Sequence, residues 1–137
     1  MNNAFIIHTD GGARGNPGPA GIGVVIEKNG KLFAEFGKKI GETTNNVAEY
    51  TAVINALQYI QKSGDTVGEI TFVLDSLLVV NQLMGIFKIK DAKLRVLAAE
   101  VKSLEKNLGG KVIYKAVRRE LNTRADFFVN QALDTSN

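Results

Sequence analysis

A nearly continuous apolar run, EITFVLD at residues 69–75, ends in an aspartate and lies between two segments with a helical pattern. Strands of this kind are buried on both faces, which happens where parallel strands are covered by helices on each side. The first helical pattern extends over residues 46–62, and the second begins at Ser76. This arrangement predicts a sheet that carries helices on both faces.

The other apolar runs complete the predicted order of elements. Strands are expected at residues 4–9, 21–28, 31–40, 69–75 and 111–117, and helices at 46–62, 76–84, 91–107 and 123–134. Asn29-Gly30 favours a hairpin turn between the second and third strands. We therefore predict an α/β fold with a five-stranded mixed sheet, in which three antiparallel strands are followed by parallel crossovers. The 137 residues fit a single domain, residues 1–137.

Composition excludes several kinds of site. The chain has no cysteine, so disulfides, zinc–thiolate sites and thiol nucleophiles are ruled out. No apolar run reaches the roughly 20 residues that a membrane span needs, and the N-terminus lacks the pattern of a signal peptide. We therefore expect a cytoplasmic monomer that has no membrane partner.

Positive charge is concentrated in one part of the chain. Residues 85–119 contain ten basic and three acidic side chains, a net charge of +7, whereas the whole chain carries +3. Such a segment is typical of a surface that binds nucleic acid, but a helix face that is simply solvated has the same pattern. The remaining residues are correspondingly acidic.

Two carboxylates end predicted strands. Asp10 closes the first strand and precedes a loop that is rich in glycine and contains the only two prolines of the chain, and Asp75 closes the buried strand. If the two strands are neighbours, both side chains emerge at the same edge of the sheet, where ligands of α/β proteins bind. The alternatives are that Asp10 is a turn residue and that Asp75 is a helix N-cap.

Glu49 points away from the polar face of its predicted helix. That face is marked by a stripe of four residues, Thr51, Asn55, Gln58 and Lys62. A buried, lone carboxylate costs several kcal/mol unless it is paired or bound to metal; the alternative is a neutral, hydrogen-bonded glutamate. Asp126 lies in the first turn of the last helix, a position that favours acidic residues in any protein. Four acids, with His8 as the only histidine, favour an oxygen-ligand site for magnesium or manganese.

Four phrases of the sequence together resemble type 1 ribonuclease H, in order and over nearly the whole chain. They are TDGGARGNPGPAGIG, TTNNVAEY, LDSLLVVNQLMGIFKIK and RRELNTRAD. The resemblance implies a ribonuclease H-like fold and an endoribonuclease that hydrolyses the RNA strand of RNA/DNA hybrids. It implies that Asp10, Glu49, Asp75 and Asp126 hold two Mg²⁺ ions, with Mn²⁺ as a substitute, and that the products carry 5′-phosphate and 3′-hydroxyl ends.

The resemblance also implies the contacts with the hybrid duplex. The loop that follows Asp10 would lie along the RNA and contact 2′-hydroxyls through its backbone amides and through Asn16. The expected RNA-binding residues are Gly11, Gly12, Asn16, Thr44, Asn45 and Asn46. Lys88 and Lys90, in GIFKIKDAKLR, would contact phosphates of the DNA strand.

The sequence departs from the family pattern at several places. Leu77 replaces a polar residue of many members, and KAVRRELNTR lacks the histidine that some members carry, offering Arg118, Arg119 and Glu120 instead. A tryptophan-bearing basic protrusion is missing, and without a preceding hybrid-binding domain we expect low processivity. Two rival hypotheses are an inactive nucleic-acid-binding module and another two-metal enzyme of the same fold, such as a resolvase or integrase.

Overall fold

The computed structural model describes residues 2–135, which form one five-stranded sheet in the order β3-β2-β1-β4-β5. The strands are β1 (Asn3–Ala13), β2 (Gly18–Lys28), β3 (Lys31–Thr43), β4 (Val67–Leu74) and β5 (Lys111–Ala116). The first three pair antiparallel, whereas β4 runs parallel to both β1 and β5. The predicted mixed sheet is therefore confirmed.

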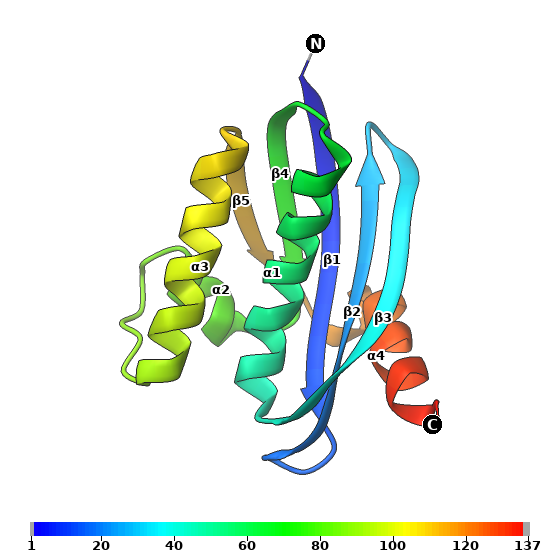
Figure 1. Ribbon diagram of the computed structural model, residues 1–137, viewed down its shortest axis with the longest axis vertical. Coiled ribbons are helices and arrows are strands. Elements are labelled where there is room, and N and C mark those ends of the chain that lie inside the picture. The colour runs from blue at the N-terminus through cyan, green and yellow to red at the C-terminus, as the bar shows by residue number, and fades with distance from the viewer. Residues whose placement is uncertain (1, 136–137) are drawn as a thin grey trace.

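Helices cover both faces of this sheet (Figure 1). They are α1 (Asn45–Ser63), α2 (Leu77–Leu83), α3 (Ala92–Leu108) and α4 (Thr123–Asp134), with a single 3₁₀ turn η1 (Arg119–Leu121) before α4. Consecutive residues of a strand face opposite sides. A Cβ atom at Gly11 would meet Ala48 of α1, and one at Gly12 would approach Val129 of α4. The helices α1 and α4 thus pack on opposite faces.

The helix ends follow the capping signals of the sequence. Thr44 caps the start of α1, and Gly64 ends it with a left-handed backbone, φ 75°. Asp91 caps α3 through a hydrogen bond from the Leu94 amide. The N-cap of α2 is Ser76, which accepts a hydrogen bond from the Val79 amide. Asp75 is therefore not a helix cap, and that alternative is wrong.

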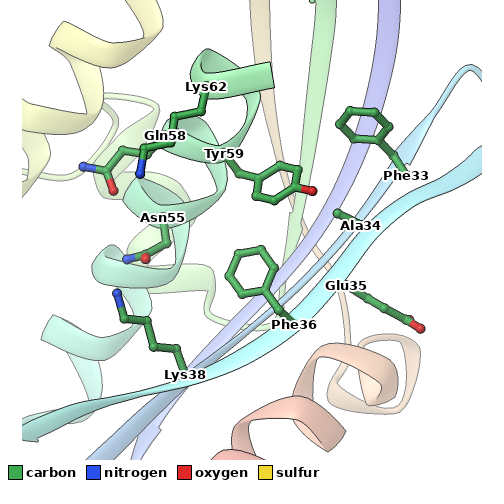
Figure 2. Close-up of a pocket in the computed structure, with 9 residues that line it drawn as sticks. All are labelled: Phe33, Ala34, Glu35, Phe36, Lys38, Asn55, Gln58, Tyr59 and Lys62. Atoms are coloured by element: carbon green, nitrogen blue, oxygen red, sulfur yellow. The ribbon is translucent and has the colours of Figure 1, made fainter. Parts of the chain in front are cut away.

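The main hydrophobic core lies between the sheet and α1, with α3 packed against α1. At the edge strand β3, three aromatic rings close this core (Figure 2). Tyr59 of α1 stacks on Phe36 with ring centroids 5.7 Å apart and meets the edge of Phe33 at 6.0 Å. Within residues 2–135, no helix is long and apolar enough to cross a membrane.

On the opposite face, α4 lies directly against the backbone of β2 and β3. A Cβ atom at Gly23 would be 2.0 Å from the Ala125 carbonyl oxygen, and one at Gly37 would be 2.3 Å from the Phe128 carbonyl oxygen. Gly23 pairs in register with both Gly37 of β3 and Asp10 of β1. The residue opposite Asp10 thus makes room for the first turns of α4.

The predicted end of the first strand is wrong. β1 continues beyond Asp10 to Ala13, and its residues 11–13 pair with residues 20–22 of β2. Gly11 and Gly12, which suggested a loop, lie within the strand, and the absence of a side chain at Gly11 gives room to α1. What ends near Asp10 is the parallel ladder with β4, whose last register pair is His8 with Val73. Asp10 therefore lies inside β1 and is not a turn residue.

Candidate metal centre

Three carboxylates from three separate elements meet at the end of the parallel ladder. Asp10 comes from β1, Glu49 from α1, and Asp75 directly follows β4. Each offers an oxygen atom, and these oxygens all lie within 4.8 Å of one another. Asp10 is 6% exposed and Glu49 7%. We call these three residues the acid cluster, whose convergence the sequence predicted.

One backbone amide joins two members of the acid cluster. The Gly11 N–H donates to Asp10 Oδ1 and to Glu49 Oε1, each at 3.0 Å. This shared hydrogen bond holds α1 at a fixed height above β1. It also occupies the Gly11 amide, which the family resemblance implies would contact RNA.

The cluster disfavours its own negative charge. Burial, followed by the charges of Asp75 and Asp126, raises the pKa of Asp10 to about 8. Burial, followed by the charge of Asp10, raises the pKa of Glu49 well above its ordinary value. The pKa of Asp75 is also raised, chiefly by burial, although nearby Arg119 lowers it. Carboxylates packed in this way need a compensating cation to be ionised together at neutral pH.

The donor set fits a hard divalent cation. Asp75 Oδ2 is buried and has no hydrogen-bond partner among the described residues. All the ligand atoms of the cluster are carboxylate oxygens, the type that Mg²⁺, Ca²⁺ and Mn²⁺ prefer. An orphaned, buried oxygen beside two further carboxylates is the arrangement that such a cation would complete.

Asp126 lies at the rim of the same hollow. It is half-buried in the first turn of α4, and its Oδ2 accepts a hydrogen bond from Asn130 Nδ2 at 3.3 Å. It is not one of the three residues whose oxygens lie within 4.8 Å of one another, but its charge raises the pKa of both Asp10 and Asp75. The hollow is lined by all four predicted acids, together with Asn45 and Arg119.

The predicted RNA-binding residues connect the β1–β2 loop to the start of α1. Asn16 Oδ1 accepts from the Asn45 amide at 2.9 Å, and Asn45 Oδ1 accepts from the Ala13 amide at 2.8 Å. Thr44 caps α1, and Asn46 is half-buried in its first turn. Asn16 and Asn45 therefore fix the loop against the start of α1 beside the acid cluster, and Asn45 and Gly12 line the hollow.

The two predicted phosphate-binding lysines lie farther along the chain. Lys88 and Lys90 are exposed on the segment that connects α2 to α3. Arg95 Nη1 donates to the Lys90 carbonyl at 2.7 Å and to the Ile89 carbonyl at 3.2 Å, which anchors this segment to α3. Leu77, at the start of α2, is 62% exposed.

Two further residues lie near the acid cluster, and the sequence pattern alone gives neither a role. Asn122 is 1% exposed, and its Nδ2 donates to the Thr9 carbonyl at 2.9 Å, which ties the start of α4 to β1. Arg119 Nε lies 3.7 Å from Asp75 Oδ2. Asn122 resembles an ordinary helix cap in the sequence, and only its burial distinguishes it. Arg119 could be noticed in the sequence, because it lies in the loop where some family members carry a histidine.

Comparison with known proteins identifies relatives that share this sequence and this fold. The family described as Reverse transcriptase-like matches residues 8–132. The bifunctional protein Rv2228c of Mycobacterium tuberculosis is 40% identical over 133 residues, which are 96% of this chain but 36% of that protein. The chain thus spans about a third of the length of this relative.

Two solved structures match over almost their whole length. RNase H1 from the halophilic archaeon Halobacterium salinarum is 37% identical with a TM-score of 0.90, covering 97% of this chain and 99% of that one. LC11-RNase H1, solved in complex with an RNA/DNA hybrid, is 45% identical with a TM-score of 0.89. The match covers 95% of this chain and 96% of that one.

The sheet order and the helices on both faces define a ribonuclease H-like fold, as the sequence predicted. Its acid cluster lies where the central parallel strands end. The chain belongs to the type 1 ribonuclease H family.

Proposed function

We propose that this chain acts, as a single domain, as an endoribonuclease that hydrolyses the RNA strand of RNA/DNA hybrids. The observation that carries the proposal is the convergence of three buried carboxylates within 4.8 Å in a member of this family. An LC11-RNase H1 structure that contains such a hybrid supports the choice of substrate.

Asp10, Glu49 and Asp75 would hold magnesium, or manganese in its place, and Asp126 would contribute from the rim. Two such ions, when bound, would supply activation of a water molecule and stabilisation of the leaving 3′ oxygen, so the products would carry 5′-phosphate and 3′-hydroxyl ends. The Gly11 amide keeps Asp10 and Glu49 oriented toward the same point. Burial of these carboxylates strengthens their interaction with a cation, because little water screens it.

Recognition of the RNA strand would use the residues beside the cluster. Gly12, Asn16, Asn45 and Asn46 lie at or beside the hollow, where they would read 2′-hydroxyls in the wide minor groove of the hybrid. A DNA strand lacks these hydroxyls, and each polar group left without its partner costs ~1–3 kcal/mol. Lys88 and Lys90 would bind phosphates of the DNA strand, which carry no sequence information.

The test uses four end-labelled duplexes of one sequence with Mg²⁺: RNA with DNA, RNA with RNA, DNA with DNA, and a DNA strand that carries a short ribonucleotide run opposite DNA. We expect internal cuts in the RNA of the hybrid and in the ribonucleotide run, and weak cutting of duplex RNA at best. Binding of the hybrid without any cut would instead identify an inactive binding module. Comparable cutting of all-DNA duplex would identify another nuclease of the same fold.

A further inference from the structure

Arg119 brings a positive charge to the acid cluster. Its Nε lies 3.7 Å from Asp75 Oδ2, a buried oxygen without a hydrogen-bond partner among the described residues. Among the ion pairs within residues 2–135, this is the one that involves the acid cluster. The neighbouring Arg118 pairs instead with Glu120, at 3.9 Å, outside the hollow.

The backbone that carries Arg119 is firmly held. In η1 and the residue after it, the Leu121 amide donates to the Arg118 carbonyl and the Asn122 amide to the Arg119 carbonyl, both at 2.9 Å. The buried side chain of Asn122 then ties this turn to β1 through the Thr9 carbonyl. The backbone of Arg119 is therefore fixed beside the acid cluster.

The tip of the same side chain is free to move. The Arg119 side chain is 79% exposed, whereas that of Asp75 is 4% exposed. Their separation of 3.7 Å is longer than a hydrogen bond, so the guanidinium is held near Asp75 by charge and not by a directional bond. It can leave the cluster without disturbing the core.

We propose that Arg119 is a displaceable counter-cation of the acid cluster, which occupies Asp75 Oδ2 in the absence of a divalent ion and yields that oxygen when the ion binds. The inference rests on the proposed metal binding. In this role Arg119 positions no reacting atom; it sets how strongly the cluster binds metal. Three clustered carboxylates repel one another, so a resident guanidinium stabilises the metal-free fold and competes with the incoming ion.

The expected size of this competition follows from the exposure of Arg119, the solvent-screened partner of a buried carboxylate. An ion pair of this kind, taken at the strength of a surface pair, is formed roughly two to five times as often as it is broken. The apparent affinity for metal falls by the fraction of molecules in which the oxygen is free. Removing Arg119 should therefore tighten metal binding about three- to sixfold.

The experiment is a calorimetric titration of the full chain with Mn²⁺, without nucleic acid, at low and high salt. Wild type is compared with Arg119→Gln, Arg119→Lys and Arg118→Gln; the last removes the same charge one residue away. We expect tighter binding in Arg119→Gln alone, with the gain reduced at high salt because exposed charges are screened. Arg119→Lys, which keeps the charge, should bind within about twofold of wild type.

Four results would overturn the inference. Equal affinities of Arg119→Gln and Arg118→Gln would show that only the net charge matters. Weaker binding in Arg119→Gln would show that Arg119 orients Asp75 for the metal. If wild type bound no Mn²⁺, the proposed function would fail as well. If Arg119→Gln bound Mn²⁺ with the affinity of wild type, and wild type cleaved hybrids, only the role of Arg119 would be lost.

Discussion

The backbone amide of Gly11 lies 3.0 Å from Glu49 Oε1, so the backbone of β1 contacts a side chain of α1 at the acid cluster. A Cβ atom at Gly11 would be 2.3 Å from the Ala48 carbonyl carbon and 2.5 Å from the Glu49 nitrogen. Real side chains do not approach so closely. The spacing between Asp10 and Glu49 therefore depends on a residue that has no side chain.

Gly11→Ala should destabilise the fold by ~1–3 kcal/mol, because the added methyl group forces α1 away from β1. It should also weaken Mn²⁺ binding, since Glu49 moves with α1. The matched control is Gly12→Ala, whose Cβ would find its nearest neighbour at 3.9 Å, an ordinary contact. Urea unfolding and metal titration of both variants measure the difference, and equal stability of the two would contradict the proposed packing.

Asp10→Asn should abolish cleavage of the hybrid yet leave hybrid binding largely intact. The substitution removes a metal ligand and at the same time reduces the repulsion between the site and phosphate. Single-turnover cleavage in saturating Mg²⁺ and a separate binding assay without metal check the two effects. A cleavage rate within about tenfold of wild type would exclude Asp10 from the metal site.

Without metal, the stability of the protein should fall as the pH rises from about 4 to 8. The folded state holds the Asp10 proton up to a pKa of about 8, whereas the ordinary value is 3.8. Between these values the folded state binds more protons than the unfolded state, so a rise in pH favours unfolding. Asp10→Asn cannot lose this proton and should be the more stable of the two at pH 8, by on the order of 1 kcal/mol or more.

Unfolding curves of both proteins in a chelator, at several pH values, test this linkage. The two stability curves should converge near pH 4, and added Mg²⁺ should stabilise wild type more than the variant at pH 8. A constant difference across this pH range would mean that Asp10 is ionised in the metal-free fold.

Neutralising Lys88, Lys90 and Lys93 together should reduce the salt dependence of hybrid binding. Each phosphate contact contributes about 0.9 to the slope of log affinity against log salt, so the slope should decrease by up to about three. A triple variant of Lys31, Lys62 and Lys106 provides the control. These exposed lysines lie at the opposite ends of β3, α1 and α3 from the acid cluster (Figure 1). Equal slopes for the two variants would place the DNA contact elsewhere.

Asn122→Ala should destabilise the fold by ~1–3 kcal/mol, because the buried Thr9 carbonyl loses its donor. Asn122→Asp should be worse, since it presents an acceptor to that carbonyl and adds a charge near the acid cluster. Thermal unfolding of both variants measures this order. The exposed Asn130, changed to Ala, is the control for loss of an asparagine on α4.

The features that follow from local periodicity were predictable from the sequence. The helical repeat alone turned Glu49 inward, and the structure buries it, as expected. The continuous apolar run predicted a parallel strand ending at Asp75, and the structure places that strand beside β1, the condition under which Asp10 and Asp75 meet at one edge. The Asn29-Gly30 turn was equally local, with φ angles of 52° and 83°.

Features that depend on contacts between distant segments were not predictable. Glycine at positions 11 and 12 favours a loop by propensity, but here both residues lie within β1, and Gly11 lets the strand continue directly beneath α1. The side chain of Asn122 reaches Thr9, which is 113 residues away in the sequence, and no pattern near Asn122 encodes that distance. Arg119 likewise meets Asp75 only through the arrangement of β4 and β5.

Gly23 and Gly37, which lie beneath α4, set the position of a site residue that neither of them contacts. Because the Ala125 and Phe128 carbonyls rest where side chains would be, any methyl group added there acts as a wedge under the helix. A displaced α4 would carry Asp126, the neighbour of Ala125, away from the acid cluster, whose three residues belong to other elements. Through these two glycines, the distance between Asp126 and the acid cluster can be adjusted without replacing any of the four acids.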